Sequence, residues 1–201
     1  MKYSDKKKLW LATIKEKRKS DNWKYTSQMI FKSLDNLFFS STFYPSLKED
    51  AISGWLAYKT MNIDNVFWDI IDEQSNKKRP LSFRGQAAFQ VWGINFFHYN
   101  IYIEDQLNPD KEIVELLKNI NDKVSEKINA IKTLADFQSD LLTDEERNSV
   151  GVITGYIEQG QIEIALAKIK EYKSKGYNPI FRFGDKDFYD LALEYCRKNY
   201  R

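Results

Sequence analysis

The stretch "LFFSSTFYPSLKEDAISGWLAYK" (residues 37–59) decides the fold, because large apolar residues alternate with smaller or polar ones in both of its halves. Successive side chains of a strand point to opposite faces of the sheet, so a period of two predicts half-buried strands. Each half then has one apolar face, made by Leu37, Phe39 and Phe43 in the first and by Ile52, Leu56 and Tyr58 in the second. The two halves predict neighbouring strands of an antiparallel meander.

Similar alternation occurs on both sides of this stretch. Upstream, "WKYTSQMIFK" (residues 23–32) predicts one strand, and "SLDN" (residues 33–36) supplies turn residues after it. Downstream, "GQAAFQVW" (residues 85–92) and "FFHYNIYIE" (residues 96–104) predict two more. Helical spacing appears in residues 4–19 and again in "IDNVFWDIIDEQ" (residues 63–74). The first half of the chain therefore predicts an antiparallel sheet of about five strands flanked by helices.

From Asn108 onward the apolar residues recur at steps of three and four, which predicts helices. Asn108 and Pro109 suit a helix start, and residues 113–141 indicate one long helix, or two with a break near Asn121–Asp122. Thr143–Glu146 has the form of a capping box for the next helix. Residues 110–201 should contain no strand of four or more residues. Within them, residues 177–185 have the sequence that comes closest to a strand. The expected class is α+β, with a sheet domain over 1–105 and an all-helical region over 106–201.

Length and composition limit the classes of protein to which this chain can belong. A chain of 201 residues can bury one substantial core or two small ones, and 42% hydrophobic with 30% charged residues is typical of a globular protein. A net charge of +2 does not by itself indicate nucleic acid or an anionic membrane as partner. Cys196 is the single cysteine, so no internal disulfide can form, which fits a reducing compartment. No run approaches the roughly 18 apolar residues of a membrane span, and we expect a cytoplasmic protein.

The most basic loop, "KKRPLSFRG" (residues 77–85), is the predicted binding site. Lys77, Lys78 and Arg79 are three consecutive cations, and Arg84 beside Gly85 can hold a carboxylate or phosphate through two parallel hydrogen bonds. The alternative is a solvated loop between a helix and a strand. Replacing His98 should leave function nearly intact, whereas replacing Arg84 together with Lys78 should weaken it.

His98 is the only histidine, and its surroundings argue against catalysis. Alternation predicts that Phe97, Tyr99, Ile101 and Ile103 are buried, while His98 and Asn100 are more exposed. A histidine can act as a general base near neutral pH, but the sequence shows no second catalytic group at a readable spacing. One histidine and one cysteine are too few for a zinc site, so no metal, cofactor or catalytic residue is predicted.

Two further interactions are compatible with the sequence, namely nucleic-acid binding and homodimerisation. A lysine-rich first helix beside sheet aromatics could bind single-stranded nucleic acid, but a buried face for those aromatics is favoured, because exposing them is costlier. The long helix that begins near Asn108 could form a homodimeric coiled coil or pack within the chain, and both alternatives stay open.

Residues 63–89, "IDNVFWDIIDEQSNKKRPLSFRGQAAF", resemble a family of small bacterial proteins of unknown function. The shared pattern is a strand ending in Tyr-Lys, an Ile-Asp-x-x-Phe-Trp-x-Ile helix, and Pro-Leu-Ser-x-Arg before a small-residue strand. The matching positions are Tyr58, Lys59, Ile63, Asp64, Phe67, Trp68, Ile70, Pro80, Leu81, Ser82 and Arg84. The resemblance spans residues 20–105 and implies a coherent bacterial domain, with no activity or catalytic residue attached to it.

Taken together, these patterns favour a non-enzymatic accessory protein of the bacterial cytoplasm that binds another protein, as an adaptor or a toxin-neutralising protein does. The rival hypothesis is an enzyme or nucleic-acid-binding protein that uses Lys59, Arg84 and His98. Catalytic residues need not be adjacent in the chain, so the sequence leaves this rival open.

Overall fold

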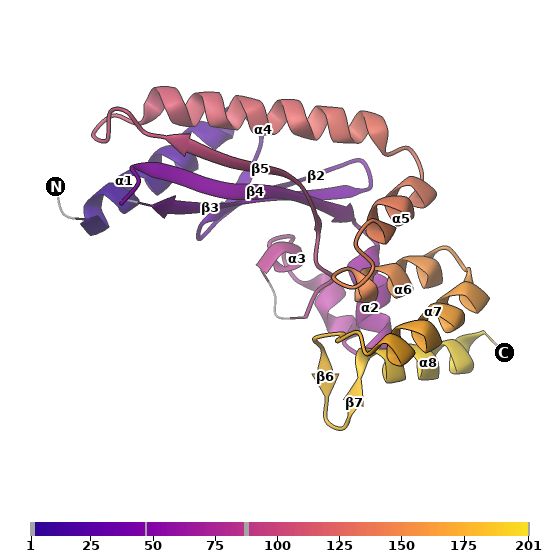
Figure 1. The fold of residues 1–201 in the computed structure, drawn as a ribbon. Coiled ribbons are helices and arrows are strands. Elements are labelled where there is room, and N and C mark those ends of the chain that lie inside the picture. Colours follow the sequence, from indigo (N-terminus) through magenta and orange to yellow (C-terminus); the bar gives the residue numbers. More distant parts are fainter. Residues whose placement is uncertain (1–2, 47, 87–88, 201) are drawn as a thin grey trace. The chain divides into compact units, whose positions relative to one another are not determined.

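The computed structural model describes residues 3–46, 48–86 and 89–200, and it is built around one antiparallel five-stranded sheet of order β1-β2-β3-β4-β5 (Figure 1). The strands are β1 (Lys24–Thr26), β2 (Met29–Leu34), β3 (Leu37–Ser46), β4 (Ala51–Thr60) and β5 (Ile94–Tyr102). The predicted α+β class is confirmed. One face of β3 and β4 forms the predicted core, because the side chains of Leu37, Phe39, Phe43, Ile52, Leu56 and Tyr58 are buried.

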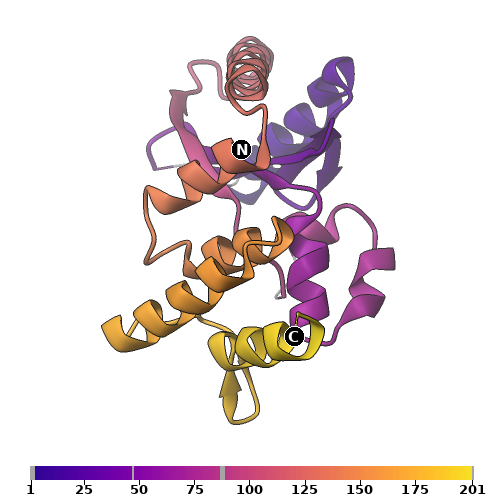
Figure 2. The ribbon, with the colours of Figure 1, turned by 90° about the vertical axis from the view of Figure 1, so that its right-hand side faces the viewer.

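Helices α1 (Tyr3–Lys17) and α4 (Asp110–Ala130) pack beside each other, and α1 continues into the short η1 (Arg18–Asp21). Figure 2 shows α4 nearly end-on above the sheet. Trp23 Nε1 donates a hydrogen bond to Asn121 Oδ1 of α4 at 2.9 Å, and the Lys127 ammonium lies 5.0 Å from the centre of the Tyr58 ring. The apolar stripe of α4 is buried within the single chain: Ile113, Leu116, Leu117, Ile120 and Val124. Of the two uses considered for this helix, packing within the chain is present in the structure, and the homodimer stays a prediction.

Tyr99 ties three strands of the sheet together. Its hydroxyl donates to the Thr42 carbonyl oxygen at 2.8 Å and lies 3.0 Å from Ser41 Oγ, both on β3. To reach them from β5, the ring crosses β4 at Gly54, where a Cβ would collide with both Tyr99 and the Thr42 carbonyl. A glycine is therefore required at this close approach.

The remaining elements form a helical bundle with a small hairpin. They are α2 (Ile63–Ile70), η2 (Gln74–Lys78), α3 (Phe83–Gln86), α5 (Leu134–Leu142), α6 (Ser149–Glu158), α7 (Ile162–Lys175), β6 (Arg182–Phe183), β7 (Lys186–Asp187) and α8 (Phe188–Asn199). Helix α2 packs against α6 and α8, as Figure 2 shows for α8, and the Phe67 ring stacks on Phe188 with 5.5 Å between centroids. Within residues 110–200 the strands are two residues long, which confirms the prediction of no longer strand there.

The chain divides into two compact units that interleave along the sequence. The sheet unit holds residues 1–58 and 95–130, and the helical unit holds residues 59–94 and 131–201. The expected division had a single boundary between residues 105 and 106. The observed division differs, because α4 belongs to the sheet unit and α2 belongs to the unit of the later helices. The reason is that α4 buries its stripe on the sheet unit, whereas Phe67 of α2 packs on Phe188 of α8.

Several element predictions were wrong in detail. Residues 23–32 form the hairpin β1–β2, since the chain turns at Ser27, whose φ is 50°. Of the strand predicted over 85–92, Ala87 and Ala88 lie outside the described residues, Gly85 and Gln86 end α3, and residues 89–92 are not a strand. The sheet reaches five strands because the hairpin supplies the one that residues 85–92 do not.

The helix boundaries after residue 108 also differ from expectation. The break falls at residues 131–133, between α4 and α5, and not at Asn121–Asp122. Thr143 does not begin a helix: it ends α5, and its hydroxyl donates to the Asp140 carbonyl oxygen at 2.7 Å. Among the helices of the described residues, none combines the length and the apolar composition needed to cross a membrane.

Candidate functional site: an exposed apolar patch

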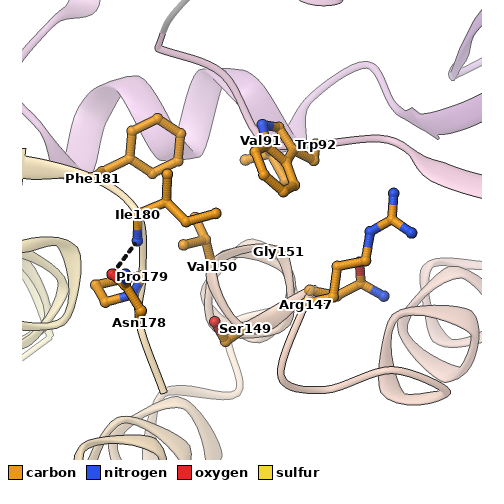
Figure 3. A pocket seen from close by; sticks show the side chains of 11 residues that line it. Val91, Trp92, Arg147, Ser149, Val150, Gly151, Asn178, Pro179, Ile180 and Phe181 are labelled. Carbon is orange, nitrogen blue, oxygen red and sulfur yellow. Dashed lines mark hydrogen bonds between the residues drawn. The ribbon is translucent and has the colours of Figure 1, made fainter. Parts of the chain in front are cut away.

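Three large apolar side chains of the helical unit are exposed to solvent around one small pocket. Phe89 is 42% exposed, Trp92 47% and Ile180 52%. Trp92 and Ile180 both line the pocket, and Phe89 lies 6.5 Å, between ring centroids, from Phe181, which also lines it. Figure 3 shows the Ile180 side chain between Phe181 and Trp92. We call Phe89, Trp92 and Ile180 the apolar patch.

The backbone at Ile180 is strained. Its φ is 66°, and the Phe181 N–H donates to the Pro179 carbonyl oxygen at 2.7 Å, which closes a three-residue γ-turn around it. A γ-turn of this hand is rare, and a positive φ is particularly unfavourable for a β-branched residue. The Asn178 side chain supports the turn, because its Oδ1 accepts the Ile180 N–H at 2.9 Å, the dashed bond in Figure 3. Strain of this kind costs about 1–3 kcal/mol and tends to occur at functional sites.

The pocket itself is small. It encloses about 20 Å³, lined by Val91 and Phe181 and by the first turn of α6. That is room for one water or one methyl group, far below the roughly 300–1,000 Å³ of small-molecule sites. Gly151 is closely packed here, since a Cβ there would lie 3.0 Å from Leu141 Cδ2 and 3.3 Å from Val91 Cγ1. Arg147 lies at the rim with its side chain exposed.

A buried ionic cluster holds the segment that carries the patch. Lys59, at 2% exposure, donates to Asp64 Oδ1 at 2.9 Å, to Gln90 Oε1 at 3.2 Å and to the Val91 carbonyl oxygen at 2.7 Å. Asp64, which is fully buried, accepts the Val91 N–H at 3.0 Å. Both backbone groups of Val91 are thus bound by charged side chains. We call Lys59, Asp64 and Arg84 the ionic cluster.

Arg84 completes the cluster from the other side. Its guanidinium donates to the Met61 carbonyl oxygen at 2.8 Å and to Asn65 Oδ1 at 2.8 Å, and it lies 3.4 Å from Asp64 Oδ2. It also stacks over the Trp68 ring at 4.9 Å. A buried charge is tolerated only when paired and hydrogen-bonded, and these contacts meet that condition.

Burial lowers the pKa of Lys59, and the negative charge of Asp64 opposes that shift. The Asp64 carboxylate therefore offsets part of the cost of burying a charged lysine here. The indole of Trp68 adds another restraint on the same segment, because its Nε1 donates to the Phe89 carbonyl oxygen at 2.8 Å. Segment 89–92 is consequently anchored at three of its four residues, through the backbone of Phe89 and Val91 and through the side chain of Gln90.

The predicted binding residues separate into two groups. Arg84 is buried and fully engaged in the ionic cluster, and Lys77 forms an ion pair with Asp69 at 2.5 Å. Lys78 and Arg79 are exposed, and the Arg79 guanidinium lies 5.7 Å from the centre of the Phe83 ring. The loop therefore exposes three of the four cations, of which Lys77 is paired with Asp69, and Arg84 is buried in the ionic cluster.

Of the three residues named for the rival hypothesis, Lys59 and Arg84 meet at Asp64, while His98 belongs to the sheet unit. His98 is exposed as predicted, and with Asn100 it lines a shallow depression of about 470 Å³. The other residues of this lining are Tyr44, Ser53, Gly54, Trp55 and Tyr99, which include no carboxylate. Tyr99 and Ile103 are buried as predicted, whereas Phe97 and Ile101 are only partly buried.

Sequence reasoning missed the apolar patch. Phe89 and Trp92 fall in the strand predicted over residues 85–92, and Ile180 falls in residues 177–185, where a strand comes closest to forming. In the described residues there is no group of three or more histidine, cysteine or acidic side chains placed to hold a metal ion.

Comparison with known proteins finds no protein family, no curated protein and no solved structure that matches this chain. The resemblance of residues 20–105 to small bacterial proteins therefore stays a prediction.

Proposed function

We propose that this protein is a non-enzymatic protein-binding protein, of the adaptor, accessory or toxin-neutralising kind, and that it binds its partner through the apolar patch. The observation that carries the proposal is the display of Phe89, Trp92 and Ile180 in solvent on a backbone that is anchored by the ionic cluster and strained at Ile180. The bacterial cytoplasm as its setting belongs to the same proposal.

The energetics favour covering this surface. Burying a side chain of this size contributes about 1.5–3 kcal/mol, so three exposed apolar residues forgo a substantial stabilisation in the free chain. Exposed apolar clusters on soluble proteins commonly mark interaction sites. Tryptophan and arginine dominate the energetics of protein interfaces, and here Trp92 and Arg147 line the same pocket.

The geometry also indicates the chemistry of the partner. A pocket of about 20 Å³ admits the tip of one aliphatic side chain and not a metabolite. Arg147 at the rim favours a carboxylate beside that side chain. The exposed Lys78 and Arg79 would add attraction for an acidic partner, weakening as salt rises. Because Lys59 and Arg84 are buried and hydrogen-bonded within the ionic cluster, they favour a scaffold role over the rival hypothesis.

The test uses two patch variants in a pull-down from source cells, with identified partners quantified by mass spectrometry. Trp92→Ala should reduce retention of a specific partner about thirtyfold or more, as loss of a hot-spot residue does. Ile180→Asn should also reduce it, yet should stabilise the fold slightly, because asparagine tolerates a positive φ. Opposite changes in binding and stability separate a docking role from a structural one.

The controls are matched within the same unit. Ile164→Asn removes an isoleucine that is 44% exposed on α7 and should leave retention unchanged. Lys78→Ala with Arg79→Ala tests the cationic loop against Arg197→Ala with Lys198→Ala, an exposed basic pair on α8. Retention that survives both patch variants would refute the proposal, and loss only with Lys78 and Arg79 would assign binding to the loop.

A further inference from the structure

Strand β5 is a long edge strand without the usual protection. The sheet order places β5 at one edge and β1 at the other. β1 has three residues and includes Lys24, whereas β5 has nine. An edge strand presents a row of unpaired N–H and C=O groups that can pair with another chain, and short length or a lysine discourages this. Only the β1 edge has those protections.

The sequence of β5, "INFFHYNIY" (residues 94–102), contains no aspartate, glutamate, lysine, arginine, proline or glycine. Three of its side chains are open to solvent: His98 and Asn100 are exposed, and Tyr102 is 68% exposed. In the described part of the chain, the backbone hydrogen bonds formed outside helices and strands include none from residues 94–102. The outer edge of β5 therefore offers its backbone groups and a neutral, aromatic-rich set of side chains.

We propose that β5 pairs with β5 of a second copy of this chain, antiparallel and about a two-fold axis near His98, so that the two sheets become continuous. About a two-fold axis, the same strand edge forms the contact surface in both copies. In this register the two His98 residues lie opposite each other, and the backbone of Phe97 in each copy lies opposite that of Tyr99 in the other.

A second copy fits this edge better than a charged peptide does. Like charges opposite one another destabilise paired strands, and an uncharged strand is among the few that can face themselves without that penalty. The net charge of +2 adds little repulsion between copies. The α4 helix is not needed for the contact, because its apolar stripe is already buried within one chain.

Sedimentation velocity tests the proposal on the full chain. The unmodified protein should sediment as a species of twice the 23.8 kDa chain mass. His98→Lys places a lysine opposite a lysine at the two-fold axis, and Asn100→Lys adds a second like charge beside that pair, so the double variant should weaken dimerisation by at least roughly tenfold. Mixing this variant with His98→Glu and Asn100→Glu should restore a dimer that contains one chain of each kind.

Two controls decide where the contact lies. Val114→Lys changes a residue that is 51% exposed on α4 and should leave the dimer intact, and so should Trp92→Ala in the apolar patch. Circular dichroism must show native helix and sheet content for each variant. A monomer at about 100 µM unmodified protein, a dimer that persists in the lysine variant, or a mixture without rescue would each overturn the proposal.

Discussion

Asp64 shows most clearly how a single buried residue can organise the side chains around it. Its two carboxylate oxygens bind Lys59, Arg84 and the Val91 N–H within a volume closed to water. Two cations that a sequence would mark as candidates for phosphate binding or catalysis are held there in structural roles. The apolar patch depends on them, since Val91 lies between Phe89 and Trp92 in the chain.

We expect Asp64→Asn to lower the free energy of unfolding by about 3–5 kcal/mol, because it leaves Lys59 and Arg84 buried without a counter-charge. Urea denaturation measures this directly. Asp72→Asn is the matched control: Asp72 is exposed with a φ of 58°, which asparagine accepts, so its effect should stay within about 0.5 kcal/mol. Equal losses in the two variants would mean that Asp64 does not stabilise the cluster.

Cys196 makes stability depend on pH. Burial raises the pKa of its thiol from 9.0 to about 11. The folded chain keeps this proton where the unfolded chain loses it, so the contribution is complete below about pH 9 and disappears as pH rises to about 11. Between these values the unmodified protein should lose about 2 kcal/mol more unfolding free energy than Cys196→Ala. Parallel pH profiles for the two proteins, measured by urea denaturation, would contradict this.

At the scale of single elements, capping shows what a local motif can and cannot specify. Thr143 and Glu146 have the residue types of a capping box, but Thr143 has helical angles, with φ −66° and ψ −24°, and ends α5. Thr133, with φ −134° and ψ 164°, is extended and does cap α5, with Asp136 as its partner. A side chain can cap a helix only where the backbone turns out of it, and that turn is not encoded by the motif alone.

Helix α8 has the other complete capping box of the described residues. Asp187 Oδ1 accepts the Asp190 N–H at 3.0 Å, and the Asp187 N–H donates back to Asp190 Oδ2 at 3.2 Å. Asp187→Ala should therefore cost about 1 kcal/mol of unfolding free energy. Thermal unfolding compared with Asp185→Ala, an exposed aspartate two residues earlier, provides the measurement. A melting temperature lowered equally in both variants would show that the cap contributes nothing.

The missed hairpin has a similar cause. Residues 23–32 alternate as one strand would, and the turn at Ser27 and Gln28 contains neither glycine, proline nor asparagine. Thr26 pairs with Met29 across a two-residue loop, and Ser27 adopts a φ of 50° without a residue type that signals it. Turn chemistry is a strong signal when present, but tertiary pairing can impose a turn without it.

At the scale of the molecule, the helical unit is assembled from two separated stretches of chain. Residues 59–94 leave the sheet after β4 and return to it at β5, and they bring α2 into the later helices. The Phe67 ring lies between Phe181, at 5.0 Å, and Phe188, at 5.5 Å, measured between centroids. The unit thus draws part of its core from residues far earlier in the sequence.

We predict that a fragment of residues 106–201 will not unfold cooperatively on heating, because it lacks α2 and would leave Phe181 and Phe188 without the Phe67 ring. Circular dichroism should show a gradual loss of helix for the fragment and a sigmoidal one for the full chain. Adding a peptide of residues 59–94 should increase its ellipticity. A sharp transition in the fragment alone would show that residues 106–201 form an independent domain.

The sequence by itself determined the α+β class, the buried faces of β3 and β4, the exposure of His98 and the helical character of residues 110–200. Each of these follows from periodicity, which is local: a side chain two or four positions away shares a face whatever the rest of the chain does. The same local reasoning located the basic loop.

Only the tertiary structure decided which of these residues are enclosed. Arg84 and Lys78 are six positions apart in one basic loop, yet Arg84 is buried on Asp64 and Lys78 is exposed. Phe89 and Ile180 are as apolar as the core residues, yet both are exposed, because the chain packs other side chains into the interior. Burial depends on partners that are distant in the sequence, so no local pattern could separate the scaffold of this protein from its surface.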